Sequence, residues 1–196
     1  DSFKGSASAM QAAQALRAGW RTVRPGDEVT CLPMADGGEG TLEVIAAADR
    51  AAQWRWQPGV RRADGSTHRA PWLWLPAERR GVIELAAACG LTTQDTRHPL
   101  TASTEGLGQV IAAALAAGAQ ALTVALGGSA STDGGAGALA ALGARLIDRA
   151  GQTVLFGGGA LRAVTEIDLS GLAAAPPGGV DLLTDVDAPL LGPNGS

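Results

Sequence analysis

Residues Ala121 to Leu146 read ALTVALGGSASTDGGAGALAALGARL, and this stretch decides the fold class. Its first part, Leu122 to Leu126, is apolar and partly β-branched, which predicts a buried strand. A glycine-rich loop follows, where few side chains protrude and backbone N–H groups can approach a ligand closely. Apolar residues then recur at the spacing of one helix face, at Ala138, Leu139, Leu142 and Leu146. A strand, a glycine-rich loop and a helix in this order suit an anion, most often a phosphate.

The central loop has two interpretations. Its glycines alone could form a tight turn packed close to a neighbour, but such a turn does not require the polar residues Ser129, Ser131, Thr132 and Asp133. Asp133 is either a ligand of a metal or a hydroxyl, or only a helix cap. The chain contains no GxxxxGK[ST] motif, which excludes a P-loop of the Walker type. We expect phosphate or substrate contacts at Gly127, Gly128, Ser129, Ser131, Gly134 and Gly135.

The composition narrows the classes of partner. The 196 residues are 46% hydrophobic, which allows a sizeable core, and the formal net charge is −4. No basic stripe is present, which argues against nucleic acid as a partner. Cys31 and Cys89 are too few for a disulfide framework, so a cytoplasmic location is expected. No apolar run approaches about 20 residues, so we expect no membrane span.

Carboxylates recur in three glycine-rich or strand-following loops: Asp36 with Glu39, Asp133, and Asp185 with Asp187. Such carboxylates suit Mg²⁺, which takes one or two protein oxygens and leaves its other positions to phosphate and water. They also suit general-base catalysis on a hydroxyl. The alternative for each is an Asx turn or a helix cap. The spacing does not say whether the three loops converge in space.

The predicted elements indicate an α/β fold with a boundary near residue 53. Helix, strand, loop and helix come first, and Ser8 with Gln11 has the spacing of a capping box. From Trp54 onward, alternating strands and hairpin-type turns replace this pattern. Strands are expected at 28–32, 53–56, 72–75, 81–85, 122–126, 153–155 and 180–184, and helices at 8–20, 41–48, 104–118 and 160–165.

Lys4 lies just ahead of the first predicted helix. Its ammonium group could pair with a carboxylate or a phosphate as a point charge. The alternative is an ordinary exposed lysine. His68 and His98 are isolated in the sequence, so neither is a candidate metal ligand.

Four longer motifs are Asp1–Ser6 (DSFKGS), Ala35–Thr41 (ADGGEGT), Gly127–Gly137 (GGSASTDGGAG) and Asp185–Gly195 (DVDAPLLGPNG). These motifs resemble signature stretches of the bacterial glycerate kinase family of the first type. They occur in the family's order, and the resemblance covers essentially the whole chain. One departure is Thr132, where the family often has Asn; the change leaves Asp133 in place.

The resemblance implies ATP-dependent phosphorylation of glycerate with Mg²⁺, giving 2-phosphoglycerate in most relatives. It implies catalytic roles for Asp133 and Lys4, with Lys4 as the cation for the carboxylate of glycerate. Glycerate and ATP are then the expected partners, and homo-oligomerisation is left open. The expected metal ligands are Asp36, Asp185 and Asp187, and further phosphate- or substrate-binding residues are Ser2, Ser6, Gly37 and Gly38.

The resemblance also implies two α/β domains around a cleft. Residues 1–53 would be the N-terminal part of a Rossmann-like domain, incomplete in this chain, and residues 54–196 an inserted mixed-sheet α/β domain with the glycine-rich phosphate-binding loop. Family members usually begin with a short strand and continue beyond Gly195, so we expect a fragment that is inactive alone. Apolar residues left exposed near its start would be Leu16, Trp20, Leu42 and Ile45.

Two other functions stay open. A phosphate- or nucleotide-binding module would bind nucleotide without turnover. An enzyme of the phosphosugar isomerase type would act on a phosphorylated substrate without ATP. A kinase, by contrast, would consume ATP only in the presence of a hydroxy acid.

Overall fold

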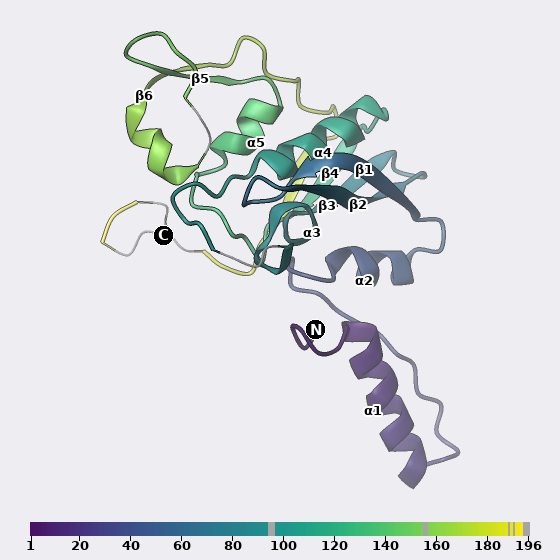
Figure 1. The fold of residues 1–196 in the computed structure, drawn as a ribbon. Helices are drawn as coiled ribbons and strands as arrows, with labels where there is room; N and C mark the ends of the chain where they lie inside the picture. Colours follow the sequence, from purple (N-terminus) through teal and green to yellow (C-terminus); the bar gives the residue numbers. More distant parts are fainter. Residues whose placement is uncertain (94–96, 155–156, 188, 190, 194–196) are drawn as a thin grey trace.

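A five-stranded mixed sheet is the centre of the fold, in the strand order β1-β2-β3-β4-β7 (Figure 1). The structure is a computed structural model and describes residues 1–93, 97–154, 157–187, 189 and 191–193. β1, β2 and β3 pair antiparallel, whereas β3, β4 and β7 run parallel. The predicted α/β class is thus confirmed. The strands are β1 (Gln53–Arg61), β2 (Thr67–Leu75), β3 (Arg80–Glu84), β4 (Ala121–Ala125) and β7 (Val180–Leu183).

Helices cover both faces of this sheet because its central strands carry apolar residues on both sides. In β3, Val82 packs with Leu42 of α2, and the next residue, Ile83, belongs to a separate cluster with α3 and α4. Successive residues of a strand point to opposite faces, which explains the two clusters. The helices are α1 (Ala9–Val23), α2 (Thr41–Ala48), α3 (Leu85–Cys89), α4 (Glu105–Ala116) and α5 (Ala136–Ala141), with 3₁₀ turns η1 (Leu91–Thr93) and η2 (Gly158–Ala163).

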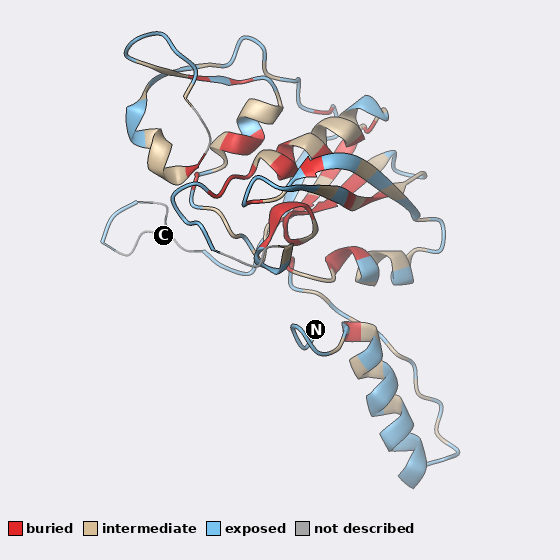
Figure 2. Ribbon diagram, viewed as in Figure 1, coloured by how far each residue is buried: buried red, intermediate tan, exposed pale blue. Residues whose placement is uncertain are grey.

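Helix α1 projects away from the sheet (Figure 1), and Figure 2 shows that it is mostly exposed. Ser8 and Gln11 form the predicted capping box at its start. Leu16 and Trp20 are 76% and 55% exposed, as expected. The expectation for Leu42 is wrong, because α2 packs on the sheet and leaves Leu42 only 1% exposed. Ile45 is half-buried against the same cluster, so it too is less exposed than expected.

Several local expectations differ from the structure. Residues 28–32 form no strand. The helix after the central loop ends at Ala141, because Gly143 turns the chain with a φ of +107°, and Leu146 lies in a strand instead. That strand, β5 (Arg145–Asp148), pairs antiparallel with β6 (Val164–Asp168) in a second sheet that the sequence pattern did not predict.

Two further expectations concern the segment between β5 and β6. The strand expected at 153–155 is reduced to a single bridge between Ile147 and Thr153, and residue 155 lies outside the described residues. The helix expected at 160–165 is the 3₁₀ turn η2, after which β6 begins at Val164. The domain boundary near residue 53 stays a prediction, although α2 packs on strands that follow it.

Candidate active site

The loops that carry the sequence motifs meet at one edge of the sheet. The parallel strands β3, β4 and β7 all end at this edge. The Leu126 N–H donates to the carbonyl of Leu183 (3.0 Å), and the Gly127 N–H donates to the carbonyl of Gly37 (2.9 Å). The carbonyl of Gly128 accepts from the Leu91 N–H (2.9 Å). Loops far apart in the sequence therefore converge, which the spacing of their carboxylates had left open.

The glycines of the central loop differ in what surrounds them. A Cβ at Gly127 would lie 2.5 Å from the Cα of Gly38, so this position packs backbone against backbone. A Cβ at Gly128, where φ is +72°, would meet the Cβ of Ala86 at 3.1 Å. Gly134 and Gly135 have no described heavy atom within 4 Å of a Cβ position. The first two glycines therefore fit a packing role, and the last two leave room beside the backbone.

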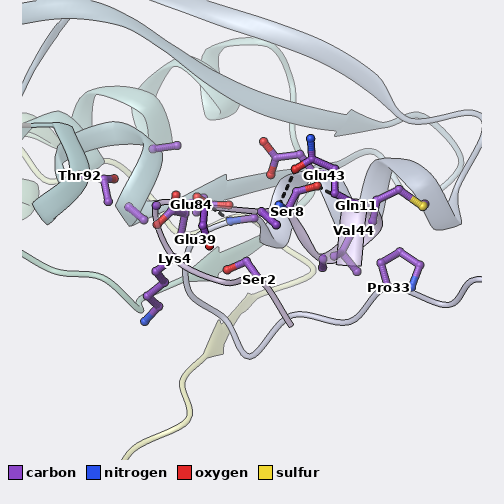
Figure 3. Close-up of a pocket in the computed structure, with 18 of the residues that line it drawn as sticks. Ser2, Lys4, Ser8, Gln11, Pro33, Glu39, Glu43, Val44, Glu84 and Thr92 are labelled. Atoms are coloured by element: carbon purple, nitrogen blue, oxygen red, sulfur yellow. Dashed lines mark hydrogen bonds between the residues drawn. The ribbon is translucent and has the colours of Figure 1, made fainter. Parts of the chain in front are cut away.

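A cavity of about 430 Å³ lies beside the loop junction (Figure 3). Its walls come from the N-terminal segment and the start of α1, from the loop leading into α2, and from the end of β3 with α3 and η1. The Oγ of Ser2 is buried there and has no hydrogen-bond partner among the described residues. The polar residues of the lining are Ser2, Lys4, Ser6, Ser8, Gln11, Glu39, Glu43, Glu84, Thr92 and Thr93.

Glu84, the last residue of β3, is the most buried charged residue of this lining, with 3% of its surface exposed. Its Oε2 accepts from the Leu42 N–H (3.1 Å) and its Oε1 from the Gly40 N–H (3.4 Å), at the N-terminus of α2. Burial, together with the nearby charges of Glu43 and Glu39, raises the pKa of Glu84 to about 7, and the two amide hydrogen bonds oppose this rise. The sequence pattern did not single out Glu84. The feature that could have indicated it is a single acidic residue in the otherwise apolar run 81–85.

Asp133 lies in a different setting and is only 1% exposed. Its carboxylate accepts from the N–H and the hydroxyl of Thr104 and from the N–H groups of Gly135 and Gly137, at 2.8–3.2 Å. It thereby links the starts of α4 and α5. The structure gives Asp133 a capping role, and its catalytic role stays a prediction.

The other predicted site residues fall into three groups. Ser2, Lys4 and Ser6 line the cavity together; Lys4 is exposed, and the Ser6 hydroxyl donates to the Phe3 carbonyl (2.9 Å). Ser129 and Ser131 lie on the central loop with their hydroxyl oxygens 3.3 Å apart.

The predicted metal ligands form the third group. Asp36 accepts from the Gly38 N–H (2.9 Å) in an Asx turn, and Asp185 and Asp187 are exposed after β7. Within the described residues, no three His, Cys, Asp or Glu side chains are grouped to hold a metal ion.

The profile of the Glycerate kinase family matches residues 1–196. The chain belongs to the glycerate kinase family. It is 43% identical over 199 residues to the glycerate kinase of Bacillus subtilis (strain 168) and 40% identical over 200 residues to the glycerate 2-kinase of Escherichia coli (strain K12). Both alignments cover 100% of this chain and 52% of the relative, so the chain spans about half the length of the curated relatives it matches.

A solved structure of this family has the same fold. It is a crystal structure of a protein proposed to be glycerate kinase 2 from Salmonella typhimurium LT2, with a TM-score of 0.82 and 37% identity, covering 99% of this chain and 53% of that one. Among the described residues, no helix combines the length and apolar character that crossing a membrane requires.

Proposed function

We propose that the full-length protein transfers a phosphoryl group from ATP to glycerate and forms 2-phosphoglycerate. The observation that carries this proposal is the convergence of the glycine-rich loops beside a cavity lined by hydroxyls, carboxylates and Lys4. Phosphoryl transfer depends mainly on positioning and on electrostatic stabilisation, which amides and a cation can supply. Membership of the glycerate kinase family and the name of the Escherichia coli relative support the substrate and the product.

The residues divide between the two substrates. An added Cβ at Gly134 or Gly135 would meet no described atom within 4 Å, so this part of the loop leaves room for the phosphates of ATP, although the Gly135 N–H already donates to Asp133. In the cavity, Lys4 suits the carboxylate of glycerate, and the buried Oγ of Ser2, which has no partner among the described residues, suits one of its hydroxyls. A bound small polar ligand would satisfy that oxygen, since a buried polar group without a partner is costly.

The predicted carboxylate ligands could supply only part of the coordination of Mg²⁺. Asp36, Asp185 and Asp187 do not form a three-residue cluster, but Mg²⁺ commonly uses one or two carboxylates together with phosphate oxygens and water. When bound, the ion would neutralise charge on the transferring phosphate. We retain these three residues as candidate ligands. A cytoplasmic location, homo-oligomerisation and the inactivity of residues 1–196 alone stay predictions.

The test is a coupled ADP-release assay on the full-length protein with glycerate, tartronate and glyoxylate. The kinase proposal expects ADP release that depends on glycerate, and ³¹P NMR should identify the product as 2-phosphoglycerate; 3-phosphoglycerate would contradict the proposed position of transfer. Nucleotide binding without ADP release would favour a binding module. Conversion of a phosphorylated sugar without ATP would favour an isomerase.

A further inference from the structure

We propose that Glu84 is a catalytic residue that accepts the proton of the hydroxyl being phosphorylated. This assignment rests on the proposed function. Glu84 was not singled out by its sequence context, and it becomes conspicuous only through its place in the cavity (Figure 3).

The position of Glu84 meets the geometric requirement for such a group. It ends β3 at the sheet edge where the loops converge, and its carboxylate lies in the cavity lining. Ala86, two residues on, lines the same cavity and faces Gly128 of the central loop. A hydroxyl bound against Glu84 is therefore on the side of the cavity where Ala86 packs on the central loop at Gly128.

The hydrogen bonds of Glu84 hold the carboxylate but leave acceptor capacity. Each oxygen takes one amide N–H, from Gly40 or Leu42. A carboxylate has about four acceptor positions, so a substrate hydroxyl can still donate to it. The two amides come from the N-terminus of an eight-residue helix, which orients the carboxylate and lets it ionise despite its burial.

The charged groups that face Glu84 tune its protonation. Glu39 and Glu43 approach from the loop and from α2, and Lys4 lines the cavity on the N-terminal segment. Burial and the two carboxylates hold the pKa of Glu84 at about 7. A general base works best when its pKa lies near the working pH, because it is then both ionised and sufficiently basic.

Phosphoryl transfer with Glu84 as the base exchanges one oxygen–phosphorus bond for another. The hydroxyl oxygen forms a bond to the γ-phosphorus of ATP, and its proton moves to a carboxylate oxygen of Glu84. The bond between the γ-phosphorus and the oxygen bridging to the β-phosphate breaks, and its electron pair leaves with ADP. Glu84 then releases the proton to solvent as the product departs.

The test compares Glu84→Gln with Glu43→Gln in the full-length protein. At pH 8, where Glu84 is ionised, E84Q is expected to lower kcat by about 100-fold or more. E84Q should also remove the acid limb near pH 7 from the profile of kcat/KM for glycerate at saturating ATP, with the Kd for ATP unchanged within about twofold. An acid limb caused by protonation of ATP would persist in E84Q. An acid limb near pH 7 that persists in E84Q therefore overturns the assignment of Glu84 as the base.

Glu43→Gln provides a readout that leaves Glu84 in place. Glu43 is exposed, and its charge raises the pKa of Glu84, so E43Q should move the acid limb to lower pH. If circular dichroism shows that E84Q does not fold, this shift decides: a moved limb supports the assignment and an unmoved limb overturns it. If the wild-type protein turns over and E84Q has the same kcat, only the assignment of Glu84 is overturned. An absence of ADP release by the wild-type protein with every hydroxy acid overturns the proposed function as well.

Discussion

Glu84 and Asp133 are both buried carboxylates near helix starts, yet their surroundings differ. Asp133 receives four donor groups from the starts of two helices, and the residues that line the described cavity do not include it. Glu84 receives two amide N–H groups and faces a cavity. Both are at most 3% exposed. The number of donors and the presence of open space therefore separate a cap from a candidate reactive group, and burial alone does not.

Asp133→Asn should lower the stability of the fold more than any of the substitutions that follow. The new amide N–H₂ would face N–H donors of Thr104 or Gly137, and buried donors would lose their acceptor. We expect a loss on the order of 3 kcal/mol in the free energy of unfolding, measured by urea denaturation.

Asp148→Asn is the matched control, because this half-buried Asp accepts from the N–H groups of Ala150 and Gln152 in a local turn. It should cost no more than about 1 kcal/mol. A stable Asp133→Asn protein whose kcat falls by about 100-fold would restore the catalytic role of Asp133 and break the contrast.

The pH dependence of stability should reveal Glu84 directly. Its pKa rises from an ordinary 4.5 to about 7 on folding, so the folded chain holds a proton that the unfolded chain has lost between these values. Stability is then full below pH 4.5 and falls as the pH rises through 7, by on the order of 3 kcal/mol. Thermal unfolding of wild type and Glu84→Gln at pH 5 and pH 8 measures this.

Glu84→Gln should lose most of this pH dependence, because its side chain does not titrate. An equal fall of Tm with pH in both proteins would mean that Glu84 ionises normally. The difference between Glu84, with two amide donors beside a cavity, and Asp133, with four donors, would then have no electrostatic consequence.

Gly127→Ala should show how tightly the two loops pack at their junction. The added methyl would lie 2.5 Å from the Cα of Gly38, so the two loops must move apart, at a cost of about 2 kcal/mol. Gly134→Ala is the control: its Cβ would meet no described atom within 4 Å, and its φ of +58° costs about 1 kcal/mol. A Gly127→Ala protein as stable as wild type would contradict the close packing of the two loops.

Lys4→Met should have the smallest effect on the fold, because Lys4 is exposed. The substitution keeps the apolar stem and removes the charge. In the full-length protein we expect the KM for glycerate to rise by about tenfold, with Tm unchanged, if Lys4 binds the carboxylate of the substrate. Unchanged kinetics would return Lys4 to the role of a solvated lysine and would leave the Glu84 cavity without its cation.

Much of the local structure could be predicted from the sequence. The capping box at Ser8 and Gln11 and the strand beginning near Leu122 follow from short-range spacing, and both are confirmed. The helix after the central loop was predicted too long, because apolar spacing continues past Gly143, where the backbone turns. The sheet of β5 and β6 was missed since its strands are short and only partly apolar.

Hydrophobic periodicity and turn residues are properties of neighbouring positions, so the sequence by itself determined the α/β class and the loops that carry glycines and carboxylates. Only the tertiary structure decided that Asp133 is surrounded by hydrogen-bond donors and that Glu84 keeps acceptor positions beside a cavity. The donors of Asp133 include Thr104, 29 residues away, and those of Glu84 lie 42 and 44 residues away. Such partners are brought together by the pairing of parallel strands and the packing of helices on them, and no local pattern encodes that meeting.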